Sequence, residues 1–209
     1  MPFVNRVNSH IVSFLRSYGS DALILESQNR SLQQPSPDRS LSIGTLESLY
    51  ISPSRVSTTC LTKPYGSIFS QEDNSFQSVL EFCLFDPTDP DAGILVDDIV
   101  VVGHTGCGAI KASQEIACGN NNIVPDPNSG LHAWLAPIVE LAKLHPCLEQ
   151  NKLAVENIKR QVELIAASPL IDRHVHRPGG HPVIIHGWLY DITTAKLSDV
   201  SKCTVNRRD

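Results

Sequence analysis

Residues 99–110 read Ile-Val-Val-Val-Gly-His-Thr-Gly-Cys-Gly-Ala-Ile, an apolar run followed by a glycine-rich turn. Four β-branched residues in succession favour a strand buried on both faces, and the glycines allow the chain to turn into a helix. The sequence therefore predicts His104 and Cys107 at the carboxyl end of a core strand, where open α/β sheets hold their chemistry.

His104 and Cys107 offer an imidazole and a thiolate, two groups that zinc prefers as ligands. A cysteine at a helix start ionises more readily, because unpaired backbone N–H groups point towards it. The alternative is a buried cysteine beside a hydrogen-bonded histidine. These two residues by themselves do not separate the two interpretations.

The composition predicts one soluble domain over residues 1–209, because this length can bury one sizeable core. A net charge of -5 without a Lys/Arg-rich run argues against nucleic acid as a partner. No apolar segment approaches the roughly 18 residues that would span a membrane.

Residues 1–20 carry two arginines and no acid, which weakly resembles a mitochondrial transit peptide. They lack the apolar block of a secretory signal, so we expect a cytoplasmic protein. The six cysteines follow no disulfide framework, so we expect most of them to be small buried hydrophobic residues or free thiols; only Cys107 has a ligand-like neighbour.

Hydrophobic periodicity predicts helices and strands in alternation, which favours a mainly parallel sheet with helices on both faces. The expected helices cover residues 4–15, 74–84, 109–117 and 131–142, with one more starting at an Asn151 cap; the expected further strands cover 49–51 and 182–190. We expect a loop over 27–45, a solvated turn holding His174, His176 and His181, and a frayed chain after Val200. Asn157 and Gln161 either bind backbone groups of a neighbouring element or face solvent.

Three segments of the chain, taken together, resemble the β-class carbonic anhydrases. Residues 104–108, His-Thr-Gly-Cys-Gly, are similar to the second metal half-site of that family, His-x-x-Cys-Gly. Residues 156–162 and 186–191 resemble two further family segments and follow in the family's order. The resemblance is good from about residue 74 to 200 and poor before that.

The resemblance implies a β-carbonic-anhydrase-like fold and a Zn²⁺ ion bound by His104 and Cys107. It also implies that zinc-bound hydroxide attacks carbon dioxide to give bicarbonate, with Arg55 as a catalytic residue and Gly108 as a substrate-binding residue. Members of the family pair into homodimers or larger oligomers, with the N-terminal helix reaching across to the partner.

The family's first half-site, Cys-x-Asp-Ser-Arg-Val, is matched only in its second half, residues 54–56. Ile51 stands at the position of the cysteine and Pro53 at that of the aspartate, and an Arg-Asn turn expected after Phe69 is missing. A catalytic zinc ion usually has three protein ligands, so one ligand is lacking. Replacement by Cys60 is a further hypothesis.

Three hypotheses follow. The chain is a zinc carbonic anhydrase with altered ligands, or it is a catalytically impaired relative that acts as an oligomerisation or anion-binding partner of an active paralogue. In the third hypothesis residues 27–73 derive from an incorrect gene model, which sequencing of the transcript would test.

Overall fold

The computed structural model describes residues 41–44, 50–52, 61–62, 66–84, 98–120, 126–178 and 180–207. Its strands are β1 (Leu41–Gly44), β2 (Tyr50–Ser52), β3 (Leu61–Thr62), β4 (Asp98–His104), β5 (Val183–Asp191) and β6 (Lys196–Val205). Its helices are α3 (Asn74–Leu84), α4 (Gly108–Ala117), α5 (Gly130–Leu144), α6 (Gln150–Ala166) and α7 (Pro169–His176). The helix predicted over residues 4–15, and Arg55, Pro53 and Cys60, lie outside the described residues.

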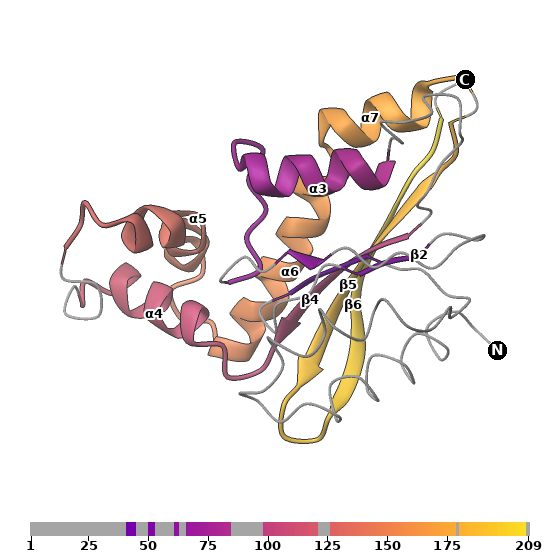
Figure 1. Ribbon diagram of the computed structural model, residues 1–209. Coiled ribbons are helices and arrows are strands. Elements are labelled where there is room, and N and C mark those ends of the chain that lie inside the picture. The colour runs from indigo at the N-terminus through magenta and orange to yellow at the C-terminus, as the bar shows by residue number, and fades with distance from the viewer. Residues whose placement is uncertain are drawn as a thin grey trace, which may run out of the picture.

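One mixed sheet forms the centre of the molecule, with strand order β3-β1-β4-β5-β6 and β2 also paired with β4 (Figure 1). Strands β3, β1, β4 and β5 are parallel neighbours, whereas β6 is antiparallel to β5 and β2 is antiparallel to β4. This arrangement confirms the α/β fold class and the mainly parallel sheet. Within the expected loop over 27–45, residues 41–44 form β1 instead, because their backbone pairs with β4.

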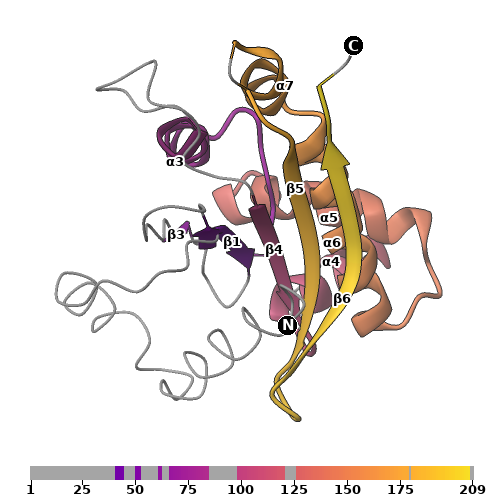
Figure 2. The same cartoon turned by 90° about the vertical axis from the view of Figure 1, so that its right-hand side faces the viewer.

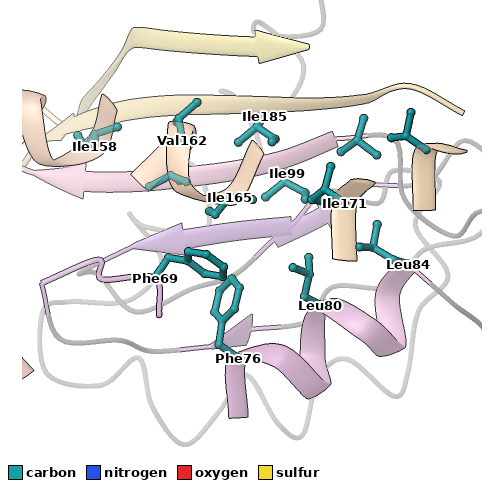
Figure 3. Packing of buried hydrophobic residues seen from close by; sticks show 13 residues of the cluster. Phe69, Phe76, Leu80, Leu84, Ile99, Ile158, Val162, Ile165, Ile171 and Ile185 are labelled. Atoms are coloured by element: carbon teal, nitrogen blue, oxygen red, sulfur yellow. The ribbon is translucent and has the colours of Figure 1, made fainter. Parts of the chain in front are cut away.

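Helices α3, α6 and α7 pack on the face of the sheet that carries Ile99 and Val101, where they enclose the largest group of buried apolar side chains. Helices α4 and α5 pack against each other and against α6 in a second apolar cluster. Figure 3 shows Phe76, Leu80 and Leu84 of α3 directed towards isoleucines of β4, α6 and α7. On the opposite face Val100 and Val102 are buried with Trp188 and Tyr190, against Ala195 and Leu197. No helix of the described residues covers that face, so helices there stay a prediction. Nor is any helix in the described ranges long and apolar enough to cross a membrane.

Two glycines of the sheet allow α6 to pack close to the backbones of β4 and β5. A Cβ built on Gly187 would lie 2.7 Å from Cγ2 of Ile158, and one on Gly103 would lie 2.8 Å from its Cδ1. These distances are too short for real atoms, so Ile158 occupies space that side chains on β4 and β5 would fill. The pair of glycines therefore fixes how deep α6 sits on the sheet.

A pair of buried amides in α6 holds the segment that leads into α3. Asn157 donates its side-chain N–H to the carbonyl of Gly66 over 3.0 Å, and Gln161 accepts the backbone N–H of Phe69 over 2.8 Å. The Gln161 amide also donates to Oδ1 of Asn157 over 3.0 Å. Both side chains are buried, so of the two interpretations left open by the sequence, binding to the backbone holds.

The C-terminal part of the chain is more regular than expected. The first part of the segment predicted as a solvated turn, with His174 and His176, forms α7, where Ser168 caps the helix, Pro169 begins it and His174 is buried. His181 lies after the helix and is exposed, as expected. A proline in the first turn costs no hydrogen bond there, which favours this start. The chain after Val200 does not fray, because β6 continues through Val205 in register with β5 (Figure 2).

Candidate metal centre

The candidate site is the turn that joins β4 to α4. His104 is the last residue of β4, and Gly108 is the first of α4. The backbone N–H of Thr105 donates to the carbonyl of Tyr190 over 3.0 Å, which extends the sheet by one bond. Gly106 has φ +69°, in the left-handed region that a residue without a Cβ adopts most easily. This reversal brings Cys107 back towards His104.

The side chains of His104 and Cys107 lie close enough for each to shift the pKa of the other. Nδ1 of His104 lies 2.8 Å from the carbonyl oxygen of Thr105. A carbonyl only accepts, so Nδ1 carries the proton and Nε2 is the ring atom available to the sulfur of Cys107. The Cys107 side chain is buried and that of His104 is half-buried.

The electrostatics of the pair favour the ionised thiol. Burial raises the pKa of the Cys107 thiol, but its hydrogen bond with His104, the charge of His104 and the backbone N–H groups of Ile110 and Ala109 outweigh burial, so the pKa is lowered. Burial likewise lowers the pKa of His104, and the hydrogen bond and charge of Cys107, with the Thr105 carbonyl, raise it overall. The thiolate is the form of cysteine that binds metals.

Two side chains at the start of α6 contact the backbone of the same turn. Oδ1 of Asn151 accepts the N–H of Gly106 over 3.0 Å, and Nε2 of Gln150 donates to the carbonyl of Cys107 over 2.9 Å. The sequence indicated neither contact, since it predicted Asn151 only as a helix cap. The cap is Glu149, whose carboxylate accepts the N–H of Asn151 over 3.3 Å.

The turn between β5 and β6 supports the site from another side. The backbone N–H of Ile192 donates to the hydroxyl of Thr105 over 3.2 Å. Hydrogen bonds from Thr193 first, then from Thr194, lower the pKa of the Asp191 carboxyl; desolvation opposes them, and Thr105 adds a lesser lowering effect. The carboxylate accepts the backbone N–H groups of Thr193 and Thr194 and so orders the β5–β6 turn.

The donor atoms of His104 and Cys107 fit two positions of a zinc ion, because one neutral imidazole nitrogen and one easily ionised thiol converge. Within the described part of the chain, no group of three or more His, Cys, Asp or Glu residues is placed to hold a metal. The described residues therefore offer two candidate zinc ligands, His104 and Cys107, and a zinc site stays a prediction.

Ile51, which the sequence places at the position of a missing thiolate, lies far from this pair. It pairs with Ile99 near the start of β4, and His104 is about 16 Å further along the strand at ~3.3 Å per residue. Strand β1, in contrast, runs parallel to β4, and its last residue, Gly44, pairs with Val102. β1 and β4 thus end at the same edge of the sheet.

The remaining histidines with described contacts serve the fold. Nδ1 of His174 donates to the carbonyl of Leu84 over 3.0 Å, and His186 lies 2.8 Å from the carboxylate of Asp98 at the start of β4. His186 is buried beside Trp188. In the sheet register His186 pairs with Val100, four residues before His104 on β4.

Comparisons with known proteins identify the family of this chain. A model of the carbonic anhydrase family matches residues 55–197. Carbonic anhydrase 1 of Escherichia coli O157:H7 is 30% identical over 110 residues, 51% of this chain and 48% of that protein. A carbonic anhydrase of Candida albicans is 26% identical over 209 aligned residues, 95% of this chain and 66% of that protein. The chain thus spans about half to two thirds of the length of these relatives.

Among solved structures, tetrameric β-carbonic anhydrases from Sordaria macrospora share the fold, with a TM-score of 0.56 at 19% identity over 96% of this chain and 98% of that one. The family match covers more than half of the chain and includes the turn at His104 and Cys107. The chain is therefore a divergent member of the β-carbonic anhydrase family.

Proposed function

We propose that this chain catalyses the reversible hydration of carbon dioxide to bicarbonate at a zinc ion bound by His104 and Cys107. The observation that carries the proposal is the meeting of these two side chains at the carboxyl edge of the sheet. A zinc ion bound there supplies Lewis acidity that makes water nucleophilic near neutral pH. Family membership supports the reaction.

We assign a separate role in this reaction to each of several residues. The Thr105 carbonyl fixes the tautomer of His104, so that Nε2 is presented to the metal, and the environment of Cys107 keeps its sulfur ionised. Gly108 begins α4, where backbone N–H groups can bind an anionic product. We assign Arg55, with its planar guanidinium group, to the orientation of bicarbonate. A catalytic zinc takes three protein ligands, so the proposal requires one more donor from the residues that the structure does not describe, among which Cys60 is the candidate thiol.

We further propose that the chain forms a homodimer or a larger homo-oligomer, in line with the tetrameric assembly stated for the Sordaria macrospora relatives. Sedimentation equilibrium of the purified chain measures the assembly directly. A single species at 22.9 kDa would contradict this part of the proposal.

A second function is favoured by the position of Ile51. Since this residue pairs with Ile99 and lies at the far end of β4 from His104, the strand that carries it brings no ligand to the site. In this alternative the chain folds without metal and acts as a non-catalytic partner of an active relative.

Zinc analysis and a carbon dioxide hydration assay separate the two functions. We expect stoichiometric zinc and turnover in the wild-type chain, and loss of both in His104→Ala and in Cys107→Ala. Cys147→Ser is the matched control, because Cys147 is a free, exposed cysteine outside the turn. A folded wild-type chain without zinc and without turnover would reject the enzyme and support the non-catalytic partner.

A further inference from the structure

The turn that carries Cys107 has little rigidity of its own. It contains Gly106 at φ +69°, and glycine gives the backbone more freedom than any other residue. Gly106 is exposed, so packing does not restrain it. Cys107 itself is packed in an apolar cluster, and its carbonyl accepts the N–H of Lys111 over 3.1 Å. The position of its sulfur relative to His104 therefore depends on this packing and on the hydrogen bonds that other elements make to the backbone of the turn.

Two of these bonds come from adjacent residues of α6; in one the side chain accepts the hydrogen bond, and in the other the side chain donates it. Asn151 accepts from the N–H of Gly106, and Gln150 donates to the carbonyl of Cys107. Together they hold the peptide groups on both sides of the bond between Gly106 and Cys107. A shift of this segment would break at least one of them.

These side chains are not required to begin α6. Glu149 caps the helix with its own carboxylate, and the backbone of Leu153 bonds to the Glu149 carbonyl over 2.9 Å. Asn151 and Gln150 instead reach across 45 and 43 residues of sequence. Both are half-exposed, so their replacement leaves the apolar core intact.

We propose that Asn151 and Gln150 are positioning residues that hold the Cys107 thiolate in place for the metal. This inference rests on the proposed function, since it presupposes that His104 and Cys107 bind a metal ion. Partners that orient metal ligands typically contribute about 10- to 100-fold in metal affinity. We expect a loss of that size when either side chain is truncated.

The test is a titration of the metal-free chain with Co²⁺, followed by the thiolate-to-cobalt charge-transfer absorption, with Zn²⁺ competition to give relative affinities. Asn151→Ala and Gln150→Ala should each bind Co²⁺ about 10- to 100-fold more weakly than the wild-type chain. Gln114→Ala is the matched control, because Gln114 donates to a carbonyl, that of Leu148, over 2.8 Å and does not contact the turn.

Two conservative variants distinguish positioning from general stability. Asn151→Asp keeps an oxygen that accepts the Gly106 N–H and should restore affinity. Gln150→Glu has no donor for the Cys107 carbonyl and should not. Thermal unfolding by circular dichroism should leave all variants within a few degrees of the control.

The outcomes separate the two proposals. A charge-transfer band in the wild-type chain with equal affinity in every variant overturns the positioning role and leaves the metal site standing. A folded wild-type chain without the band overturns the metal site and this inference with it. Equal losses in Asn151→Asp and Asn151→Ala would also overturn the role assigned to the Asn151 oxygen.

Discussion

His174 should make the stability of this chain sensitive to mild acid. Its side chain is completely buried, and Nδ1 donates to the carbonyl of Leu84 over 3.0 Å. Burial is the main cause that lowers the pKa of His174 from 6.5 to about 4; the charges of Arg177 and His181 add to it, and the hydrogen bond to Leu84 opposes it. The folded chain therefore holds this ring neutral where the unfolded chain would protonate it.

The sign and size of the change in the free energy of unfolding follow from the linkage between proton binding and folding. Between pH 6.5 and about 4 the unfolded chain binds more protons at His174 than the folded chain, so the free energy of unfolding falls as the pH falls. Each pKa unit corresponds to ~1.36 kcal/mol, which gives a loss of about 2 kcal/mol by pH 5 and about 3 kcal/mol below pH 4. Above pH 6.5 the contribution is complete and constant.

Urea unfolding followed by circular dichroism measures this effect. We compare the wild-type chain with His174→Asn, whose amide can donate to the Leu84 carbonyl but does not titrate. Between about pH 7.5 and pH 5 the wild-type chain should lose about 2 kcal/mol more than the variant. His145→Asn, at an exposed histidine, should behave like the wild-type chain. Parallel pH profiles for the wild-type chain and His174→Asn would refute the argument.

Two further substitutions test the packing of α6. Gly187→Ala should destabilise the chain by about 1–3 kcal/mol in urea unfolding, because the new methyl group would overlap Ile158. Gly130→Ala meets no atom within 4 Å, and stability equal to that of Gly187→Ala would contradict the prediction. Gln161→Leu leaves the N–H of Phe69 without its acceptor and should cost about 1–3 kcal/mol. Hydrogen exchange of that amide should accelerate; unchanged exchange would show that Gln161 does not hold the segment.

The turn between β4 and α4 was predictable because the residues that indicate it are adjacent in the sequence. The β-branched run before Gly103 favours a buried strand, and the glycines that follow allow a tight turn from this strand into the next helix. The histidine and cysteine are only three residues apart, so no long-range contact was needed to bring them together. The start of the helix predicted over 74–84 is local in the same way, because the Asp73 carboxylate accepts the N–H of Ser75 at the beginning of α3.

Long-range partners were not predictable from the sequence. A glutamine on a helix looks the same whether it faces water or, like Gln161, binds a backbone group 92 residues away. Strand β6 alternates weakly and gains its order from pairing with β5, and α7 has only eight residues, too few for periodicity to be decisive. The expected position of Ile51 at the metal likewise followed a short motif, whereas strand pairing puts it beside Ile99.

The contacts that Asn151 and Ile192 make to the turn between β4 and α4 have a consequence for biosynthesis. Asn151 lies 45 residues after Gly106, and Ile192 lies 87 residues after Thr105. A ribosome that has released only β4 and α4 has made both proposed metal ligands, but neither Asn151 nor Ile192, which bind the turn from other elements. The last of these contacts forms only when the β5–β6 hairpin docks, so a chain truncated before that hairpin should bind the proposed metal ion more weakly than the chain that contains it.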